Sequence, residues 1–514
     1  MPTATTPVTA AKPVENRGLI TVSIMLATIM QALDMTIANV ALPHMQGSLS
    51  ASQDQIAWVL TSYIVAAAIM TPLTGWLAGR FGIKRVFLVS VAGFTAASML
   101  CGAAGSLEQI VLYRLLQGVF GAALVPLSQA VLLDINPREK QGQAMAIWGA
   151  GIMVGPILGP TIGGWLTEQY SWRWVFYINL PVGVLALVGI LLFVKESETG
   201  KDRPFDLFGF AFLSLGIGAF QLMLDRGEQK DWWNSTEIVI ESAIAGIGLW
   251  VFLVHSVTAK RPFVDLALFR DRNFVAGIVL MFLTSGIMYA TLALLPPMLA
   301  MLNYPVIDIG ILMAPRGVTT MIFMIIAGRI IGRVDIRLIL AFGLLMIGLS
   351  LGMMTEYSTR MDKWPVIIAG FIQGAGMGFL YVPLSTVAFS TLSPALRAEG
   401  SGIFSLLRNI GGSIGISASV AMLSQYTQVN HAELGAHITR FNPMLQLPSV
   451  QQFWSLDAQA GRAALDQIVN QQAAMIAYIG DFKLMMIVCF ATIPLLLMLS
   501  PLKGKPKAPA AAME

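Results

Sequence analysis

Long apolar runs separated by short polar segments make up most of the chain. Hydrophobic residues account for 56% of the 514 positions and charged residues for only 12%, against roughly 25% charged in a soluble domain. A run of about 20 apolar residues is long enough to cross a bilayer as an α-helix. The pattern therefore predicts an all-α polytopic membrane protein with fourteen spans, at residues 19–42, 56–78, 86–105, 108–133, 143–167, 173–194, 206–224, 236–257, 274–299, 308–331, 337–355, 365–391, 400–423 and 478–501.

Basic residues are unevenly shared between the two sides that this arrangement defines. An even number of spans places both termini on one side, and most of the 32 lysines and arginines fall in segments on that side. Cytoplasmic segments are enriched in Lys and Arg. We therefore predict a multi-pass protein of the bacterial inner membrane with both termini in the cytoplasm. Membrane orientation also explains the net charge of +4, so no nucleic-acid partner is expected.

The first and second halves of the chain contain an internal repeat. Residues 116–128 (LQGVFGAALVPLS) parallel residues 372–385 (IQGAGMGFLYVPLS), and Ala-Gly-Arg at 78–80 is echoed at 327–329. Parallel repeats of this kind are typical of transporters. We expect a cytoplasmic tail at 1–18, a six-helix half at 19–194, a linker with two extra transmembrane helices at 195–273, a second six-helix half at 274–501 with a long periplasmic loop at 424–477, and a cytoplasmic tail at 502–514.

Glycines recur at every fourth position from residue 151 to residue 163. On a helix these positions form one stripe, which lets another apolar helix approach closely. Two prolines interrupt the backbone hydrogen bonds along the same turns and weaken the helix. We predict a conformational motif that moves against a partner helix, made of Gly151, Gly155, Pro156, Gly159, Pro160, Gly163 and Gly164.

Asp34 and Arg114 place opposite charges inside apolar runs. A carboxylate about 15 residues into a span costs several kcal/mol unless it is paired, hydrated or protonated. Burial favours the neutral acid, so Asp34 can bind and release a proton, and the alternative is a structural hydrogen-bond anchor. A guanidinium keeps its proton, so Arg114 either responds to a movable charge or forms an ion pair that fixes helix packing.

Several motifs resemble those of the major facilitator superfamily. Residues 75–85 (GWLAGRFGIKR) look like its loop signature, residues 113–118 (YRLLQG) resemble its fourth-helix motif, and the glycine stripe is similar to its antiporter motif. Residues 33–43 (LDMTIANVALP) and 172–181 (WRWVFYINLP) resemble its fourteen-span drug–proton antiporter branch. Almost the whole chain is similar to the EmrB-type multidrug exporters, which implies two six-helix halves and proton-driven efflux.

The resemblance also implies roles for individual residues. It assigns proton coupling to Arg114, the role that its depth in the first span predicts for Asp34, and a cytoplasmic gate to Gly75, Arg80, Gly82, Lys84 and Arg85. Gly79 stands where the superfamily usually has an aspartate, so a charge-paired form of this gate is not expected. Candidate substrate-binding residues are Asp34, Gln117, Tyr289, Gln373 and Arg408, while no motif defines a role for Arg316.

The function predicted from these features is export of lipophilic compounds from the cytoplasm or inner leaflet by alternating access, driven by protons. A specific lipid, siderophore or metabolite exporter is the alternative, and an uptake symporter shares the same fold. Without a Walker-type loop, direct use of ATP is not expected. The 4 scattered histidines and 2 cysteines indicate no metal site, and we expect neither an enzyme nor a cofactor beyond the proton gradient.

Expected partners are hydrophobic drug-like molecules, protons and the lipid bilayer. In EmrB-like systems the exporter works with a periplasmic adaptor of the EmrA type and an outer-membrane channel. The segment 424–477 is rich in Gln and Asn and long for a connection, and segments of this length are commonly functional. We therefore consider it a candidate docking element for the adaptor.

Overall fold

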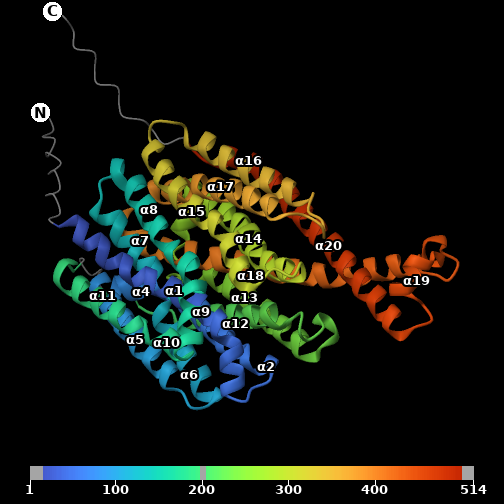
Figure 1. Ribbon diagram of the computed structural model, residues 1–514. Coiled ribbons are helices and arrows are strands. Elements are labelled where there is room, and N and C mark those ends of the chain that lie inside the picture. The colour runs from blue at the N-terminus through green and yellow to red at the C-terminus, as the bar shows by residue number, and fades with distance from the viewer. Residues whose placement is uncertain (1–15, 197–203, 501–514) are drawn as a thin grey trace, which may run out of the picture.

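The computed structural model describes residues 16–196 and 204–500. Helices from the first part of the sequence, in blue to teal, lie beside helices from the last part, in yellow to red (Figure 1). Within the described ranges, 13 helices are long and apolar enough to cross a membrane, and the bent pair Asp54–Met70 and Leu73–Phe81 raises the number to 14. The all-α fold with fourteen spans is confirmed.

The first half contains six spans, several of which are interrupted. Its helices are α1 (Arg17–Ser48), α2 (Gln53–Ile56), α3 (Trp58–Met70), α4 (Leu73–Phe81), α5 (Ile83–Ala103), α6 (Leu107–Gly121), α7 (Leu124–Ile135), α8 (Arg138–Ile152), α9 (Val154–Gln169), α10 (Trp174–Tyr177) and α11 (Asn179–Phe193). The second span bends by 56° between α3 and α4, where Pro72 supplies no N–H. Pro156 likewise leaves the carbonyl of Ile152 without its helical donor, and α8 ends at that residue.

Two inserted helices and a second six-span half follow. The inserted pair consists of α12 (Leu207–Arg226) and α13 (Thr236–Thr258), with the 3₁₀ turns η1 (Trp232–Asn234) and η2 (Leu266–Arg270). The second half comprises α14 (Arg272–Met301), α15 (Val306–Ile330), α16 (Ile336–Met354), α17 (Lys363–Ser390), η3 (Pro394–Leu396), α18 (Arg397–Ala436), η4 (Pro443–Gln446), α19 (Pro448–Trp454), α20 (Gln459–Thr492) and η5 (Ile493–Met498).

The two halves pair their helices in the same way. The first span of each half packs on the fifth, as α1 on α9 and α14 on α18. The second span packs on the fourth, as α3 on α6 and α15 on α17, and the third span also packs on the fourth. This shared pairing confirms the common plan that the repeated sequence motifs predict.

The glycine stripe of α9 packs directly on α1, the helix that carries Asp34. A Cβ atom added to Gly155 would lie 2.7 Å from the carbonyl carbon of Ala32. The hydroxyl of Thr36 donates to the carbonyl of Gly155 at 3.1 Å, and a Cβ on Gly159 would overlap Thr36. Gly164 lies off the stripe, with nothing within 4 Å of an added Cβ. The backbones of α1 and α9 therefore touch because the stripe has no side chains.

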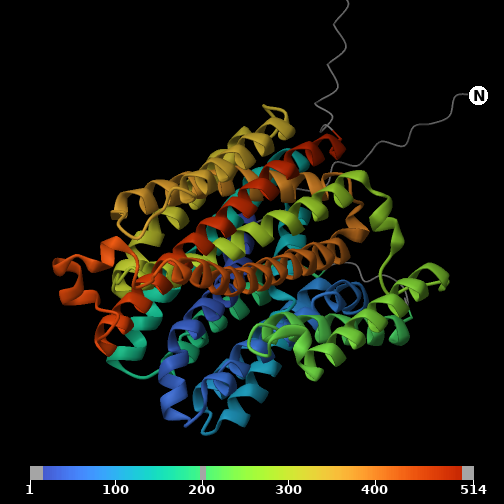
Figure 2. The same ribbon diagram turned by 90° about the vertical axis from the view of Figure 1, so that its right-hand side faces the viewer.

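The segment predicted as a loop at 424–477 is mainly helical. Helix α18 continues to Ala436, the short α19 follows, and α20 begins at Gln459. These extensions project past the other helices, at the end of the bundle away from the start of α1 (Figures 1 and 2). The amide of Asn430 donates to the carbonyl of Ala473 at 3.3 Å, and His431 lies 2.9 Å from Asp466. We call residues 424–477 the projecting hairpin.

Replacing Gly155 with leucine should destabilise the protein by about 1–3 kcal/mol, because the larger side chain separates two touching backbones. The measurement is thermal unfolding of the purified protein in detergent, where Gly155→Leu should melt several degrees below wild type. Gly164→Leu is the matched control on the same helix and should melt like wild type. Equal melting of the two variants would contradict close contact between α1 and α9.

Candidate functional site

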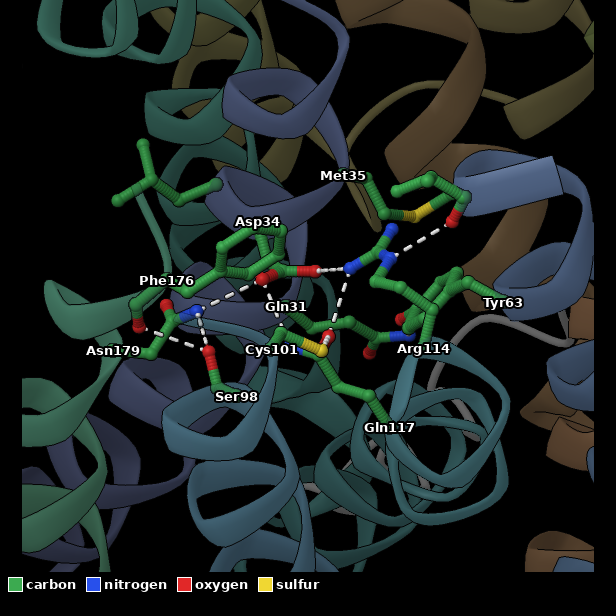
Figure 3. A network of polar contacts seen from close by, with 12 residues as sticks. Gln31, Asp34, Met35, Tyr63, Ser98, Cys101, Arg114, Gln117, Phe176 and Asn179 are labelled. Carbon is green, nitrogen blue, oxygen red and sulfur yellow. Dashed lines mark hydrogen bonds and ion pairs between the residues drawn. The ribbon is translucent and has the colours of Figure 1, made fainter. Parts of the chain in front are cut away.

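Asp34 is the centre of a buried polar network in the first half (Figure 3). Helix α1 places it inside the bundle, where the residue is 2% exposed. Its Oδ2 accepts a hydrogen bond from Arg114 Nη1 at 2.7 Å. Its Oδ1 accepts from Gln117 Nε2 at 2.8 Å and from Asn179 Nδ2 at 2.9 Å. Both carboxylate oxygens are thus satisfied by three side chains from two other helices, α6 and α11.

Arg114 also makes hydrogen bonds to several groups besides Asp34. Its Nε donates to the carbonyl of Val59 at 3.0 Å and its Nη1 to Gln117 Oε1 at 2.8 Å. The guanidinium lies over the ring of Tyr63, 4.5 Å from the ring centre, and its side chain is 1% exposed. A buried pair with this many partners offsets its desolvation, whereas removing one member leaves an uncompensated charge.

Two residues without a predicted role complete the network. Asn179, at the start of α11, also donates to Ser98 Oγ at 2.9 Å. Ser98 on α5 in turn donates to the carbonyl of Phe176 at 2.9 Å. Asn179 belongs to a motif that resembles the antiporter branch, and a polar residue in an apolar run was the available signal. Its contact with Asp34 spans 145 positions of sequence, which no local pattern reveals.

The other predicted substrate-binding residues lie in the second half, apart from Asp34 and Gln117. Arg408 donates to the hydroxyl of Tyr381 at 2.6 Å. Tyr289 on α14 packs on Gly412 of α18. Gln373 is fully buried on α17 and donates to Thr291 Oγ1 at 3.5 Å. Asp34 and Gln117 are therefore hydrogen-bonded to each other, whereas the other three candidates lie apart from them in the second half.

Arg408 borders a small, largely apolar pocket of the second half. Methionine, leucine and isoleucine side chains form most of the wall, together with the hydroxyls of Tyr381, Thr284 and Ser285. Such a wall suits flexible apolar molecules, because methionine adapts its shape. The lining residues are Met281, Thr284, Ser285, Ile287, Met288, Leu344, Ile347, Met377, Leu380, Tyr381, Leu384, Arg408 and Cys489.

The predicted gate residues cluster around the turn between α4 and α5. Gly82 adopts φ +89°, which suits glycine, and connects the two helices. Lys84 Nζ donates to the carbonyl of Leu191 at 2.8 Å, and Arg85 lies 3.5 Å from Glu196. Neither contact reaches the second half. Gly75 instead meets the second half, because a Cβ there would lie 2.8 Å from the Cβ of Glu399. Arg80, in the last turn of α4, is exposed.

Polar contacts between the two halves involve residues with no predicted gate role. Arg397, at the start of α18, lies 2.8 Å from Asp134 at the end of α7. One turn further, Ser401 Oγ donates to Gln129 Oε1 at 2.8 Å. These contacts join the first half to α18 on the side where α4 also touches it. No group of three or more His, Cys, Asp or Glu side chains that could hold a metal ion occurs within residues 16–196 and 204–500.

Comparison with known proteins assigns this architecture to a family. Residues 24–416 match the model of the Major Facilitator Superfamily. The chain belongs to the major facilitator superfamily. It is therefore a multi-pass inner-membrane protein of a transporter family. The proton:xylose symporter XylE, a solved structure, superposes with a TM-score of 0.60 at 15% identity, covering 94% of this chain and 97% of XylE, which confirms the fold.

Relatives of known name are similar over most of their length. The multidrug export protein EmrB of Haemophilus influenzae is 36% identical over 93% of this chain and 96% of the relative. The fatty acid resistance protein FarB of Neisseria gonorrhoeae is 36% identical over 83% of this chain and 84% of the relative. The multidrug resistance protein B homolog of Mycobacterium tuberculosis is 33% identical over 80% and 76%, respectively. The resemblance to EmrB-type proteins is confirmed.

Replacing Arg114 with alanine should cost about 3–5 kcal/mol, because ionised Asp34 would remain buried without its cation. Adding Asp34→Asn to Arg114→Ala should recover much of that loss, since the amide carries no charge. Thermal unfolding of wild type, both single variants and the double variant checks this as a double-mutant cycle. Additive losses would mean that the two side chains do not form an ion pair.

Proposed function

We propose that this protein is a proton-driven exporter of lipophilic compounds that works by alternating access. It takes substrates from the cytoplasm or inner leaflet, with both termini in the cytoplasm, and releases them on the opposite side. One relative is named a multidrug export protein and another a multidrug resistance protein. Both names support this function. The bias of lysine and arginine toward one side supports the orientation.

The observation that carries the proposal is the buried pair of Asp34 and Arg114. The pair is separated by 2.7 Å, and both side chains are 1% exposed. A proton that reaches Asp34 neutralises the carboxylate and removes the attraction that holds Arg114. An unpaired buried guanidinium is costly, so protonation favours a rearrangement of α1 and α6. Binding of a proton is thereby coupled to a change in helix position.

The driving force is sufficient for efflux. One proton moving inward through 100 mV releases about 2.3 kcal/mol. At about 1.4 kcal/mol for each factor of ten, this energy sustains roughly a fifty-fold gradient of a neutral solute. A gradient of this size is enough to lower the cytoplasmic concentration of a toxic compound substantially.

The apolar pocket at Arg408 is our candidate for the substrate site. Its wall supplies apolar area for a lipophilic molecule, and the guanidinium favours substrates that carry an acidic group. Fatty acid resistance, named for FarB, agrees with this preference. Because Asp34 and Gln117 lie in a separate network, we assign them to proton coupling and its support rather than to direct substrate contact in this conformation.

Contacts at the start of α18 support a closed cytoplasmic side in this conformation. Arg397 pairs with Asp134 across the two halves, and Gly75 allows α4 to touch α18. The bare stripe of α9 packs against α1, the helix that carries Asp34, so sliding of α9 along α1 would move the proton site. We therefore assign the conformational motif and the gate to the switch between inward and outward access.

Asp34→Asn should abolish gradient-driven transport, because asparagine keeps the shape but cannot titrate. The test uses inside-out vesicles, in which acidifying the interior drives a fluorescent lipophilic dye inward for an exporter. Wild type should accumulate dye, and the variant should show at most background accumulation. Arg114→Lys should retain more activity than Arg114→Ala if charge matters more than the planar guanidinium.

Accumulation of dye in the inside-out vesicles when the outside, rather than the interior, is acidified would instead identify a symporter. Full accumulation by Asp34→Asn would place proton coupling at another residue.

The projecting hairpin is our candidate for docking a periplasmic adaptor of the EmrA type, which leads to an outer-membrane channel. It extends past the other helices and exposes large apolar side chains, with Phe441 89% and Phe453 68% exposed. Such exposed groups commonly mark interaction sites.

Deleting residues 437–458 and joining α18 to α20 with a short linker should leave dye transport in proteoliposomes intact but abolish resistance in cells. The measurements are dye accumulation and growth with a hydrophobic toxin. The matched control, Phe441→Ser with Phe453→Ser, keeps the hairpin length and should reproduce the loss of resistance. Equal loss of transport in proteoliposomes would place the hairpin in the transport core.

A further inference from the structure

Asp481 is a second membrane-embedded carboxylate, in the last helix of the second half. The residue is 2% exposed, and neither of its carboxylate oxygens has a hydrogen-bond partner within the described residues. Asp34, at the same exposure, accepts three hydrogen bonds. An ionised carboxylate without a partner is far more costly in an apolar interior than a neutral acid. Its surroundings therefore favour the protonated form.

The stretch of α14 that packs alongside this part of α20 is apolar. Helices α14 and α20 run in opposite directions, with contacts between Thr291 and Met485 and between Met301 and Gln471. Asp481 lies between these two contacts. The intervening stretch of α14, residues 292–300, reads LALLPPMLA and has no polar side chain. Its two prolines lack N–H groups, so two backbone carbonyls lose their helical donors. A protonated carboxyl can donate to free carbonyls, and an ionised one cannot.

No basic side chain occurs in the neighbouring stretches that pack on this part of α20. Residues 418–423 of α18 carry no ionisable group. Beyond α16, Glu356 is exposed, and Tyr357 packs on Phe482 with ring centres 6.1 Å apart. On α20 itself, Tyr478 lies one turn away, and Lys483, two positions after Asp481, is exposed and makes no hydrogen bond to Asp481. Within residues 16–196 and 204–500, Asp481 therefore has no equivalent of Arg114.

Corresponding positions in the two halves show the same difference in how polar side chains are partnered. A Cβ added to Gly118 or to Gly374 would meet a backbone carbonyl, that of Tyr63 in the first half and that of Arg316 in the second. Gln117 donates to Asp34, whereas its repeat counterpart Gln373 donates to Thr291 and leaves Oε1 without a partner.

In the first half, the buried carboxylate of Asp34 is thus paired with a guanidinium and both of its oxygens accept hydrogen bonds. In the second half, the buried Arg316 has an Nη1 and Asp481 has two oxygens without a hydrogen-bond partner among the described residues. Buried polar groups left in this state are rare and are often functional.

We propose that Asp481 is a second proton-binding site, which holds its proton in this conformation and releases it to water when α20 moves. The inference rests on the proposed proton-driven export. Asp481 lies two turns from Cys489, a residue of the apolar pocket, or about 12 Å along the helix. Movement of α20 around a substrate therefore changes the surroundings of the carboxyl, and the two halves each carry one exchangeable proton.

The first test detects the proton directly, without any substrate. Infrared spectroscopy of the full-length protein in liposomes at neutral pH should show the carbonyl stretch of a protonated carboxyl. The band should be present in wild type and in Asp34→Asn, and absent from Asp481→Asn. Asp466→Asn is the matched control, because it removes a 61% exposed carboxylate from the same helix. If the wild-type band is missing, or persists in Asp481→Asn, the assignment is wrong.

The second test separates proton exchange from a permanently protonated structural acid. In proteoliposomes, Asp481→Asn should keep exchange of the lipophilic dye ethidium between the two sides without a gradient. It should lose up to about fifty-fold of gradient-driven accumulation, the gradient supported by one proton at 100 mV. Asp481→Glu, which can titrate, should restore accumulation and the infrared band.

Each outcome of the second test has a definite meaning. If Asp481→Asn accumulates dye to the same level as wild type, Asp481 has only a structural role and the proposal is overturned. If Asp481→Asn is unstable, Asp481→Glu decides the question. A normally folded Asp481→Glu variant without the infrared band would also overturn the proposal. Wild type that neither exchanges nor accumulates dye would contradict the proposed export instead, and the infrared result would still decide whether Asp481 holds a proton.

Discussion

The cost of burying charge inside a membrane-spanning bundle constrains this structure more than any other interaction. Asp34 and Arg114 are acceptable within the first half because each neutralises the other and every remaining polar atom of the carboxylate finds a donor. The partners come from α1, α6 and α11, so the pair also fixes how three spans sit together. In the proposed function, a change in the charge of Asp34 alters that arrangement, and protonation is thereby linked to helix movement.

Close helix contact is the second requirement of such a mechanism. The bare stripe of α9 brings its backbone against α1 beside Thr36, two positions from Asp34. The same use of glycine recurs in the second half, where a Cβ on Gly415 would lie 2.6 Å from the Cα of Gly286 on α14. Without interlocking side chains, two helices can slide at little cost, so both halves keep their first and fifth spans closely packed and movable.

The two halves share a plan but differ in how they treat polar groups. The first half pairs its buried Asp34 with Arg114, while Arg316 and Asp481 of the second half keep atoms without a hydrogen-bond partner among the described residues. The inserted pair connects these unequal halves, since Gln221 of α12 donates to Ser413 of α18 at 2.9 Å. A bundle in which one half is locked by an ion pair and the other carries unpaired groups around an apolar pocket suits coupling between a proton and a lipophilic substrate.

Much of this protein is readable from its sequence, because lipid requires spans of fixed length and makes every buried charge conspicuous. The fourteen spans, the repeat, the glycine stripe and the exceptional positions of Asp34 and Arg114 all follow from local patterns. The helical form of the projecting hairpin did not, since a polar segment of that length lacks the hydropathy signal that marks a span.

The partners of the buried groups were decided only by the tertiary structure. Contacts between distant segments decide that Asn179 and Ser98 support Asp34 and that Arg397 reaches Asp134. They also decide that Asp481 has no hydrogen-bond partner within residues 16–196 and 204–500. Sequence establishes which residues are costly to bury. Folding alone determines whether that cost is offset by a neighbour or left in place, because the offset depends on distances of about 3 Å between side chains.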